Sequence, residues 1–102
     1  MVSINTYIAE FVAVVSHCMS RQLGRQIIRN RYAIDKPSLE ALLDQNKYEE
    51  SAAKLQVWKA LRWIDADEGR DTLSIYNPSG KGQKRMVVIN LTVHQKLQEF
   101  VK

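Results

Sequence analysis

The basic side chains of one short segment offer the clearest chemistry in this sequence. Residues 77–90 carry three cations and no acid, a net charge of +3, and the first half of the segment reads Asn-Pro-Ser-Gly-Lys-Gly-Gln. Cations bind the phosphates of nucleic acids, and arginine and glutamine also reach base edges within a groove. The pattern therefore predicts a DNA-binding segment whose contact residues are Ser79, Lys81, Gln83, Lys84 and Arg85.

The order of residues within this segment indicates their roles. Gly80 and Gly82 flank Lys81 and let the backbone come close to the wall of a groove. We expect Lys81 and Lys84 to contact phosphates, and Arg85 to contact a base. The alternative is a solvated loop whose charges only keep an edge strand from pairing with another chain.

A second basic segment precedes it in the chain. Residues 20–34 hold four arginines and no acid, a net charge of +4, and three of them (Arg21, Arg25 and Arg29) follow one another at four-residue steps. The spacing indicates a basic stripe if the segment is helical. A solvated helix end that complements the helix dipole is the alternative reading.

The middle of the chain has the opposite charge. Residues 37–68 hold seven acidic and four basic side chains, a net charge of −3. Because acids oppose the approach of phosphate, we expect DNA binding to be centred on residues 77–90 rather than here. Lesser contacts are expected from three polar residues of this region: Ser51, Lys59 and Arg62.

Residues suited to catalysis or metal binding do not fall at a recognisable spacing. His17 and His94 are the only histidines and lie far apart in the sequence, and Cys18 is the single cysteine. The run Ser79–Gly82 departs from a phosphate-binding loop, because Ile75 stands at the first glycine position and Gly82 at the position of the metal-binding Ser or Thr. We therefore predict a non-enzymatic protein with no cofactor, no metal and no small-molecule ligand.

The length and composition of the chain indicate its domain organisation and its class. The 102 residues, 45% hydrophobic and 25% charged, predict one globular domain over residues 1–102. Neither a membrane-spanning run nor an export signal is evident, and a single cysteine suits a reducing compartment, so we expect a cytoplasmic protein. The net charge of +4 is a mild indication of a polyanionic partner.

The first part of the chain is predicted to form two helices with a short strand between them. Apolar residues at three- and four-residue steps predict a first helix from about Asn5 to Leu23, with Gly24 supplying a left-handed residue beyond its end. A short strand is expected at Arg31–Ile34, and Asp35-Lys36-Pro37 is typical of the start of another helix. The first helix is apolar over a wide arc, which predicts that it also faces a second subunit.

A third helix is expected from about Glu50 to Trp63. The helical wheel predicts that one face is buried and that the opposite face, with Ser51, Leu55, Lys59 and Arg62, is exposed. The residues on the predicted buried face are Ala53, Val57, Ala60, Leu61 and Ile64. Trp58 and Trp63 are expected to pack between this helix and the following strands rather than to stack on bases.

After the third helix, the spacing of apolar residues changes from a helical period to a period of two residues. Residues 72–76 and 85–91 alternate and are joined by turn formers, which predicts a β-hairpin. Thr92 is expected to cap a last helix. The residues that share its apolar face are Val93, Leu97, Phe100 and Val101.

This order of elements resembles the winged helix-turn-helix superfamily over roughly Tyr32–Leu91. The stretch Leu55–Ile75 is similar to the passage from the second helix into the wing, whereas Asn46-Lys47-Tyr48 lacks the glycine often found in the turn. The resemblance implies an α+β, mostly helical fold with a long N-terminal helix, a helix-turn-helix at about 35–64, a β-hairpin wing at about 70–91 and a C-terminal helix at about 92–102. It also implies a third helix in the major groove and a wing on the flanking backbone or minor groove.

The sequence therefore predicts a sequence-specific protein for double-stranded DNA that forms a homodimer through its first and last helices. Such a protein is either a transcriptional regulator or an accessory factor that marks a plasmid or phage site, such as an origin, on a mobile element. The alternative is a winged-helix interaction module that binds protein, not DNA, through the first helix and the acidic Glu40–Glu68 face.

Overall fold

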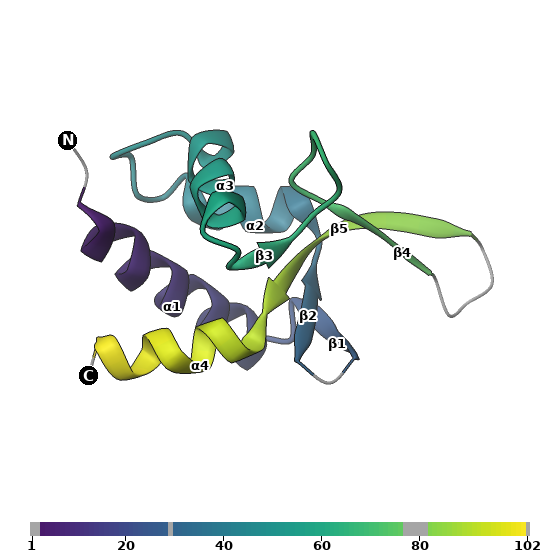
Figure 1. The fold of residues 1–102 in the computed structure, drawn as a ribbon, viewed down its shortest axis with the longest axis horizontal. Coiled ribbons are helices and arrows are strands. Elements are labelled where there is room, and N and C mark those ends of the chain that lie inside the picture. Colours follow the sequence, from purple (N-terminus) through teal and green to yellow (C-terminus); the bar gives the residue numbers. More distant parts are fainter. Residues whose placement is uncertain (1–2, 29, 77–81, 102) are drawn as a thin grey trace.

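An apolar helix near the start of the chain forms one wall of the core. The computed structural model describes residues 3–28, 30–76 and 82–101, and in it α1 (Ile4–Ser20) packs its apolar stripe against the rest of the molecule (Figure 1). The buried side chains of α1 are Tyr7, Ile8, Glu10, Phe11, Val12, Val14, Val15 and Cys18. A single chain thus buries most of the apolar stripe that the sequence predicted to face a second subunit as well as the core.

The first helix ends differently from the prediction. Gln22, with φ at 56°, adopts the left-handed conformation, and the amide of Leu23 donates to the carbonyl of Cys18 at 2.9 Å, the pattern of a Schellman motif. Gly24 instead begins a strand, where a Cβ atom would lie 2.2 Å from the carbonyl oxygen of Ala33. Glycine is required there for close approach of two strands, not for the helix end.

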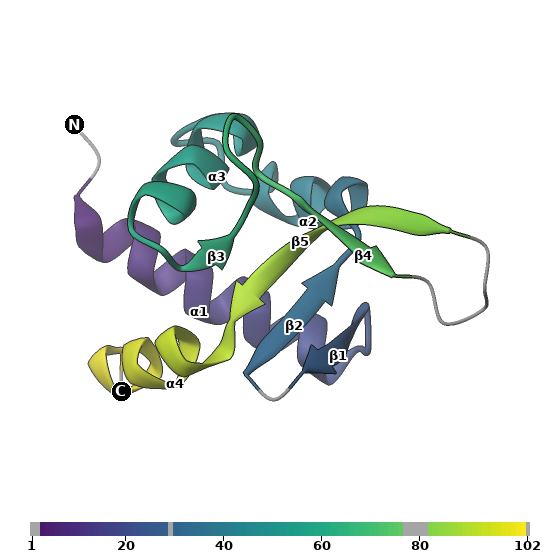
Figure 2. The same ribbon diagram turned by 45° about the vertical axis from the view of Figure 1, so that its right-hand side comes forward.

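Within residues 3–28, 30–76 and 82–101, five strands form an antiparallel sheet built around the longest strand (Figure 2). In the body of the molecule the order is β1 (Gly24–Ile28), β2 (Arg31–Ile34), β5 (Gln83–Asn90) and β3 (Ile64–Asp65). The other half of β5 pairs with β4 (Leu73–Tyr76) and forms the predicted hairpin. β5 therefore belongs to the body at one end and to the hairpin at the other.

The strand β1 was not expected from the sequence. Arg25 lies in this strand, so the proposed helical stripe of Arg21, Arg25 and Arg29 is wrong in its geometry. Arg29 itself lies outside the described residues. Residues 24–28 pair with β2, and strand pairing of this kind takes its stability from a partner that a helical periodicity cannot reveal.

Two short helices follow β2 in the chain and pack against each other. α2 (Lys36–Leu43) begins as predicted, with Asp35 accepting a hydrogen bond from the amide of Ser38 at 3.4 Å and Pro37 in the first turn. α3 (Ser51–Ala60) is shorter than predicted and ends in a second Schellman motif, in which Arg62 has a φ of 62°.

The buried face of α3 is not the one that the helical wheel indicated. Lys54, Leu55 and Trp58 are fully buried, whereas Ala60 and Leu61 are exposed. Trp58 meets Phe11 of α1 edge to face, with ring centroids 4.8 Å apart, and Trp63 lies against the same Phe11 at 5.0 Å. Packing of the two tryptophans inside the protein is confirmed, and the contact with α1 decides which way α3 faces.

The last helix, α4 (Leu91–Phe100), runs beside α1 (Figures 1 and 2). Asn90, not Thr92, caps it by accepting hydrogen bonds from the amides of Thr92 and Val93 at 3.1 and 3.2 Å. His94 is its buried residue, and Phe100 is 75% exposed, so the predicted apolar face is only partly right.

The β4–β5 hairpin gives the molecule its elongated outline. Figure 1 shows the hairpin projecting from the body on the side opposite to the start of α1 and the end of α4. The principal extents are 43 × 26 × 23 Å. The described residues thus form an α+β domain of four helices and an antiparallel sheet with a protruding hairpin. No helix in the described residues has the length and apolar character to cross a membrane.

Candidate nucleic-acid interface

Arg85 is the residue expected to contact a nucleobase. It lies near the foot of the hairpin, where it binds other residues of the protein. Its Nε donates to the Thr72 hydroxyl at 2.9 Å, and its Nη2 donates to the Thr72 carbonyl at 2.7 Å and to Asp67 Oδ2 at 2.6 Å. Thr72 is buried, while the Arg85 and Asp67 side chains are 34% and 48% exposed. The guanidinium therefore connects the hairpin to the turn that precedes it.

Lys84, the neighbouring residue, points to a different partner. Its Nζ lies 3.2 Å from Asp35 Oδ1, and its side chain is 62% exposed. The pKa of Asp35 lies below its ordinary value, mainly because Lys84 hydrogen-bonds to the carboxylate and further because Ser38 does so. Asp35 thus caps α2 and is also the counter-ion of Lys84 in the hairpin.

Lys59 of α3 reaches the same turn as Arg85. Its Nζ donates to the backbone carbonyl of Asp67 at 3.1 Å. Two cations from different elements, α3 and β5, therefore meet at Asp67. Among the predicted contact residues whose side chains the structure describes, Lys59 and Arg85 are brought together by the fold.

The remaining predicted contact residues lie apart from this pair or outside the description. Ser51 is the first residue of α3, and Arg62 is exposed just beyond the end of that helix. Gln83 is the first residue of β5 and pairs with Tyr76. Ser79 and Lys81 lie outside the described residues, as does Gly80.

Ion pairs also connect other cations with acids distant in the sequence. Arg31 binds Asp65, and Lys36 lies 3.0 Å from Asp71. Arg31 and Arg85, from the two basic segments, thus both pair with acids of residues 37–68, so the segments of opposite net charge lie beside one another in the fold. Net charge summed along the chain therefore overstates the separation of basic and acidic surfaces.

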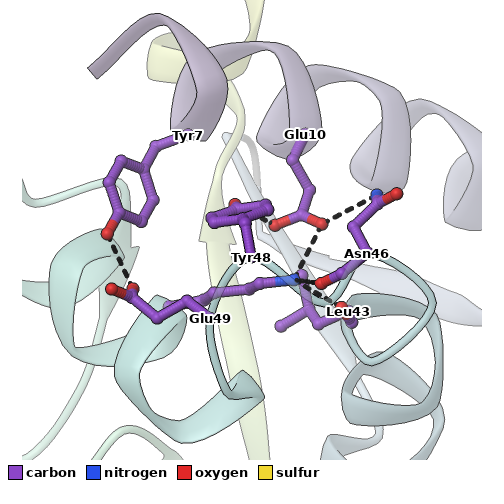
Figure 3. A network of polar contacts seen from close by, with 7 residues as sticks. Tyr7, Glu10, Leu43, Asn46, Tyr48 and Glu49 are labelled. Atoms are coloured by element: carbon purple, nitrogen blue, oxygen red, sulfur yellow. Dashed lines mark hydrogen bonds and ion pairs between the residues drawn. The ribbon is translucent and has the colours of Figure 1, made fainter. Parts of the chain in front are cut away.

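A buried polar network that the sequence analysis missed holds the loop between α2 and α3 (Figure 3). Glu10 of α1 points into this loop, where it accepts hydrogen bonds from Asn46 at 2.9 Å and from Tyr48. Lys54 Nζ lies 3.0 Å from Glu10 Oε2 and donates to the carbonyls of Leu43 and Asn46, both at 2.5 Å.

Several observations show how strongly this network is enclosed. The Lys54 side chain is fully buried and its ammonium lies 4.3 Å from the centre of the Tyr48 ring. Burial, followed by the hydrogen bond to Glu10, raises the pKa of the Tyr48 hydroxyl far above its ordinary value. Tyr7 donates to Glu49 at 2.7 Å at the edge of the same loop. One signal was available in the sequence, since Glu10 is the single Asp, Glu, Lys or Arg within the apolar α1.

One further polar pair lies between α1 and α4. Ser16 Oγ is 3.1 Å from His94 Nε2 on a shallow groove of about 460 Å³ whose lining also includes Met19 and Gln95. Among the residues that the structure describes, no three His, Cys, Asp or Glu side chains are grouped as metal ligands would be.

Comparisons with known proteins add no relative. Neither a protein-family model nor a curated protein matches this chain. A function for the chain is therefore inferred from its own residues and contacts.

Proposed function

We propose that the chain is a cytoplasmic, non-enzymatic protein that binds double-stranded DNA through its β4–β5 hairpin, with the arrangement of a winged helix-turn-helix. The observation that carries the proposal is the projection of this hairpin from the helical body (Figure 1). An isolated hairpin of this kind has room to enter or to follow a groove, while α3 supplies lesser contacts.

The charged residues of the hairpin also support the proposal that it binds DNA. Lys81, Lys84 and Arg85 are its cations, and residues 77–90 contain no acid. Phosphate neutralisation by such cations supplies most of the affinity in non-specific DNA binding. Both a transcriptional regulator and an accessory factor at a plasmid or phage site bind DNA through such phosphate contacts.

The test is a salt titration of binding to a short labelled duplex. We expect the logarithm of the affinity to fall linearly with the logarithm of the salt concentration, because each phosphate contact releases counter-ions. Lys81→Ala and Lys84→Ala should each weaken binding to all sequences and lower the salt slope by about 1. Ser51→Ala, at the start of α3, should have a smaller effect.

Lys47→Ala is the matched control, because Lys47 is an exposed lysine in the α2–α3 loop, outside the hairpin. This variant removes the same charge and should leave the slope nearly unchanged. Equal losses for Lys47→Ala and Lys84→Ala would show that only net charge matters. Absence of binding at low salt would refute the proposal and favour a protein-interaction module.

We also propose that the protein forms a homodimer through α1 and α4. Most of the α1 stripe is buried within one chain, so the support comes from the end of the molecule where α1 starts and α4 finishes. Three large apolar side chains are exposed there: Ile4, Phe100 and Val101. Two-fold pairing at this end would bury these side chains and leave both hairpins free to bind.

A further inference from the structure

We propose that Arg85 and Lys59 form a binding site for a backbone phosphate of duplex DNA, and that the carboxylate of Asp67 occupies this site when DNA is absent. The inference rests on the proposed DNA-binding function and adds to it a defined anion site and an internal competitor. It also joins the hairpin and α3 in a single contact with the nucleic acid.

The Asp67 carboxylate is an anion that Arg85 already binds. Arg85 Nη2 donates to the Asp67 carboxylate at 2.6 Å, within the range of a charge-assisted hydrogen bond, and Lys59 Nζ lies within 3.1 Å of the carbonyl of the same residue. A phosphate oxygen accepts the same hydrogen bonds as a carboxylate oxygen. Lys59 comes from a second element and donates to the neutral peptide carbonyl of Asp67, which places a second cation beside the carboxylate that Arg85 binds.

The guanidinium keeps its orientation without Asp67. Thr72 accepts from Nε through its hydroxyl and from Nη2 through its carbonyl, and Thr72 is buried. These two contacts hold Arg85 in place while the carboxylate leaves. The site is therefore organised in advance, which reduces the entropy lost when a phosphate binds.

The carboxylate of Asp67 is exposed enough to be displaced. Half of that side chain and a third of Arg85 are open to water, at 48% and 34%. Ion pairs with this exposure shift an equilibrium by no more than about five-fold, so the contact does not bar a competitor. A DNA phosphate has the further advantage of counter-ion release, which the internal carboxylate lacks.

Asp67→Asn is the informative substitution, because it removes the charge and leaves the backbone carbonyl that Lys59 contacts. We expect it to bind a short labelled duplex about two- to five-fold more tightly than the unsubstituted protein at about 0.1 M salt, with a salt slope steeper by up to about 0.9. Asp67→Ser, which is smaller, should show a gain of the same direction. Thermal unfolding of each variant verifies that it is folded.

Glu68→Gln is the matched control, because it removes the same charge from the next residue, which is also exposed, and leaves the Arg85–Asp67 contact intact. Its gain in affinity should be less than half that of Asp67→Asn. In an Arg85→Ala background, Asp67→Asn should give no gain beyond that of Glu68→Gln in the same background.

The outcomes separate this site from the proposed function. If the unsubstituted protein binds DNA and Asp67→Asn binds no better than Glu68→Gln, the Arg85–Asp67 contact is a structural link only and the inference is wrong. If no variant binds duplex at low salt, the DNA-binding function and the site are both refuted.

Discussion

At the scale of single residues, the buried pair of Glu10 and Lys54 explains how the loop between α2 and α3 keeps its shape without glycine. The Lys54 ammonium binds two carbonyls of this loop, and the Glu10 carboxylate binds the side chains of Asn46 and Tyr48. These contacts satisfy the Lys54 ammonium and the Glu10 carboxylate, whose side chains are buried. The loop is thus held by side chains from two helices.

Removal of one member of this pair should be far more harmful than removal of both charges. Lys54→Met leaves the Glu10 carboxylate buried without its cation, and we expect the free energy of unfolding to fall by about 3–5 kcal/mol. Glu10→Gln/Lys54→Met should recover a large part of this loss, because a neutral amide oxygen still accepts from Tyr48. Urea unfolding of the three variants, with Glu10→Gln as the third, measures the coupling.

A loss below about 1 kcal/mol for Lys54→Met would contradict this view, because it would be the value expected of an exposed pair. Lys47→Met is the control for the general effect of losing a lysine near this loop, since Lys47 is exposed. We expect that variant to unfold at nearly the same urea concentration as the unsubstituted protein.

At the scale of elements, the contact between α1 and α4 depends on a buried histidine. His94 is hydrogen-bonded to Ser16, and its ring lies 6.0 Å from the ring of Phe11. The pKa of His94 lies below its ordinary value of 6.5 because burial disfavours the imidazolium, while a hydrogen bond to the Val12 backbone acts in the opposite sense. The neutral ring is therefore the form that fits between the helices.

This arrangement predicts that acid weakens the packing of α4. The unfolded chain takes up the His94 proton at a higher pH than the folded chain, so stability is complete above about pH 6.5 and falls as the pH decreases below that value. Urea unfolding at about pH 7.5 and about pH 5.5 should show this loss in the unsubstituted protein. The loss should be smaller in His94→Gln, which cannot titrate.

His17→Gln is the matched control, because His17 is an exposed histidine on α1. We expect this variant to retain the full loss of stability between the two pH values. The same dependence in His94→Gln as in the unsubstituted protein would assign the acid sensitivity to other groups.

At the scale of the whole molecule, the two ends of the long axis differ in character. One end carries the hairpin, whose strand β5 includes Lys84 and Arg85, and the other carries the start of α1 and the end of α4 (Figure 1). β5 runs from the hairpin into the sheet of the body, so the hairpin is anchored by pairing with β2 and β3. Because β5 is continuous, the hairpin is connected directly to the sheet of the body.

Self-association should occur at the end away from the hairpin. We expect sedimentation at tens of micromolar to give the mass of a dimer, and Phe100→Ser to weaken the association because it removes the most exposed aromatic side chain of α4. Ile28→Ser is the control, since Ile28 is an exposed apolar residue on β1, outside the predicted interface. A monomer mass at this concentration would exclude the dimer.

Much of the element order was predictable because its signals are local in the sequence. Asp35-Lys36-Pro37 starts α2 where expected, since a cap and a proline act on the turn that they begin. The hairpin also formed where two alternating runs are joined by turn formers. In contrast, the predicted ends of α1 and α3 were wrong, because Gln22 and Arg62 take the left-handed role that glycine usually fills. The strand β1 was not predicted, because it depends on pairing with β2.

The sequence by itself determined the α+β class, the position of the helices and hairpin, and the gathering of cations in residues 77–90. Only the tertiary structure decided which face of α3 is buried, because Lys54 is directed inward by Glu10 of another helix. Only the tertiary structure decided, too, that Arg85 meets Asp67 and that Lys84 meets Asp35. Capping and periodicity act between neighbours along the chain, whereas burial and charge pairing depend on partners that folding brings from distant segments.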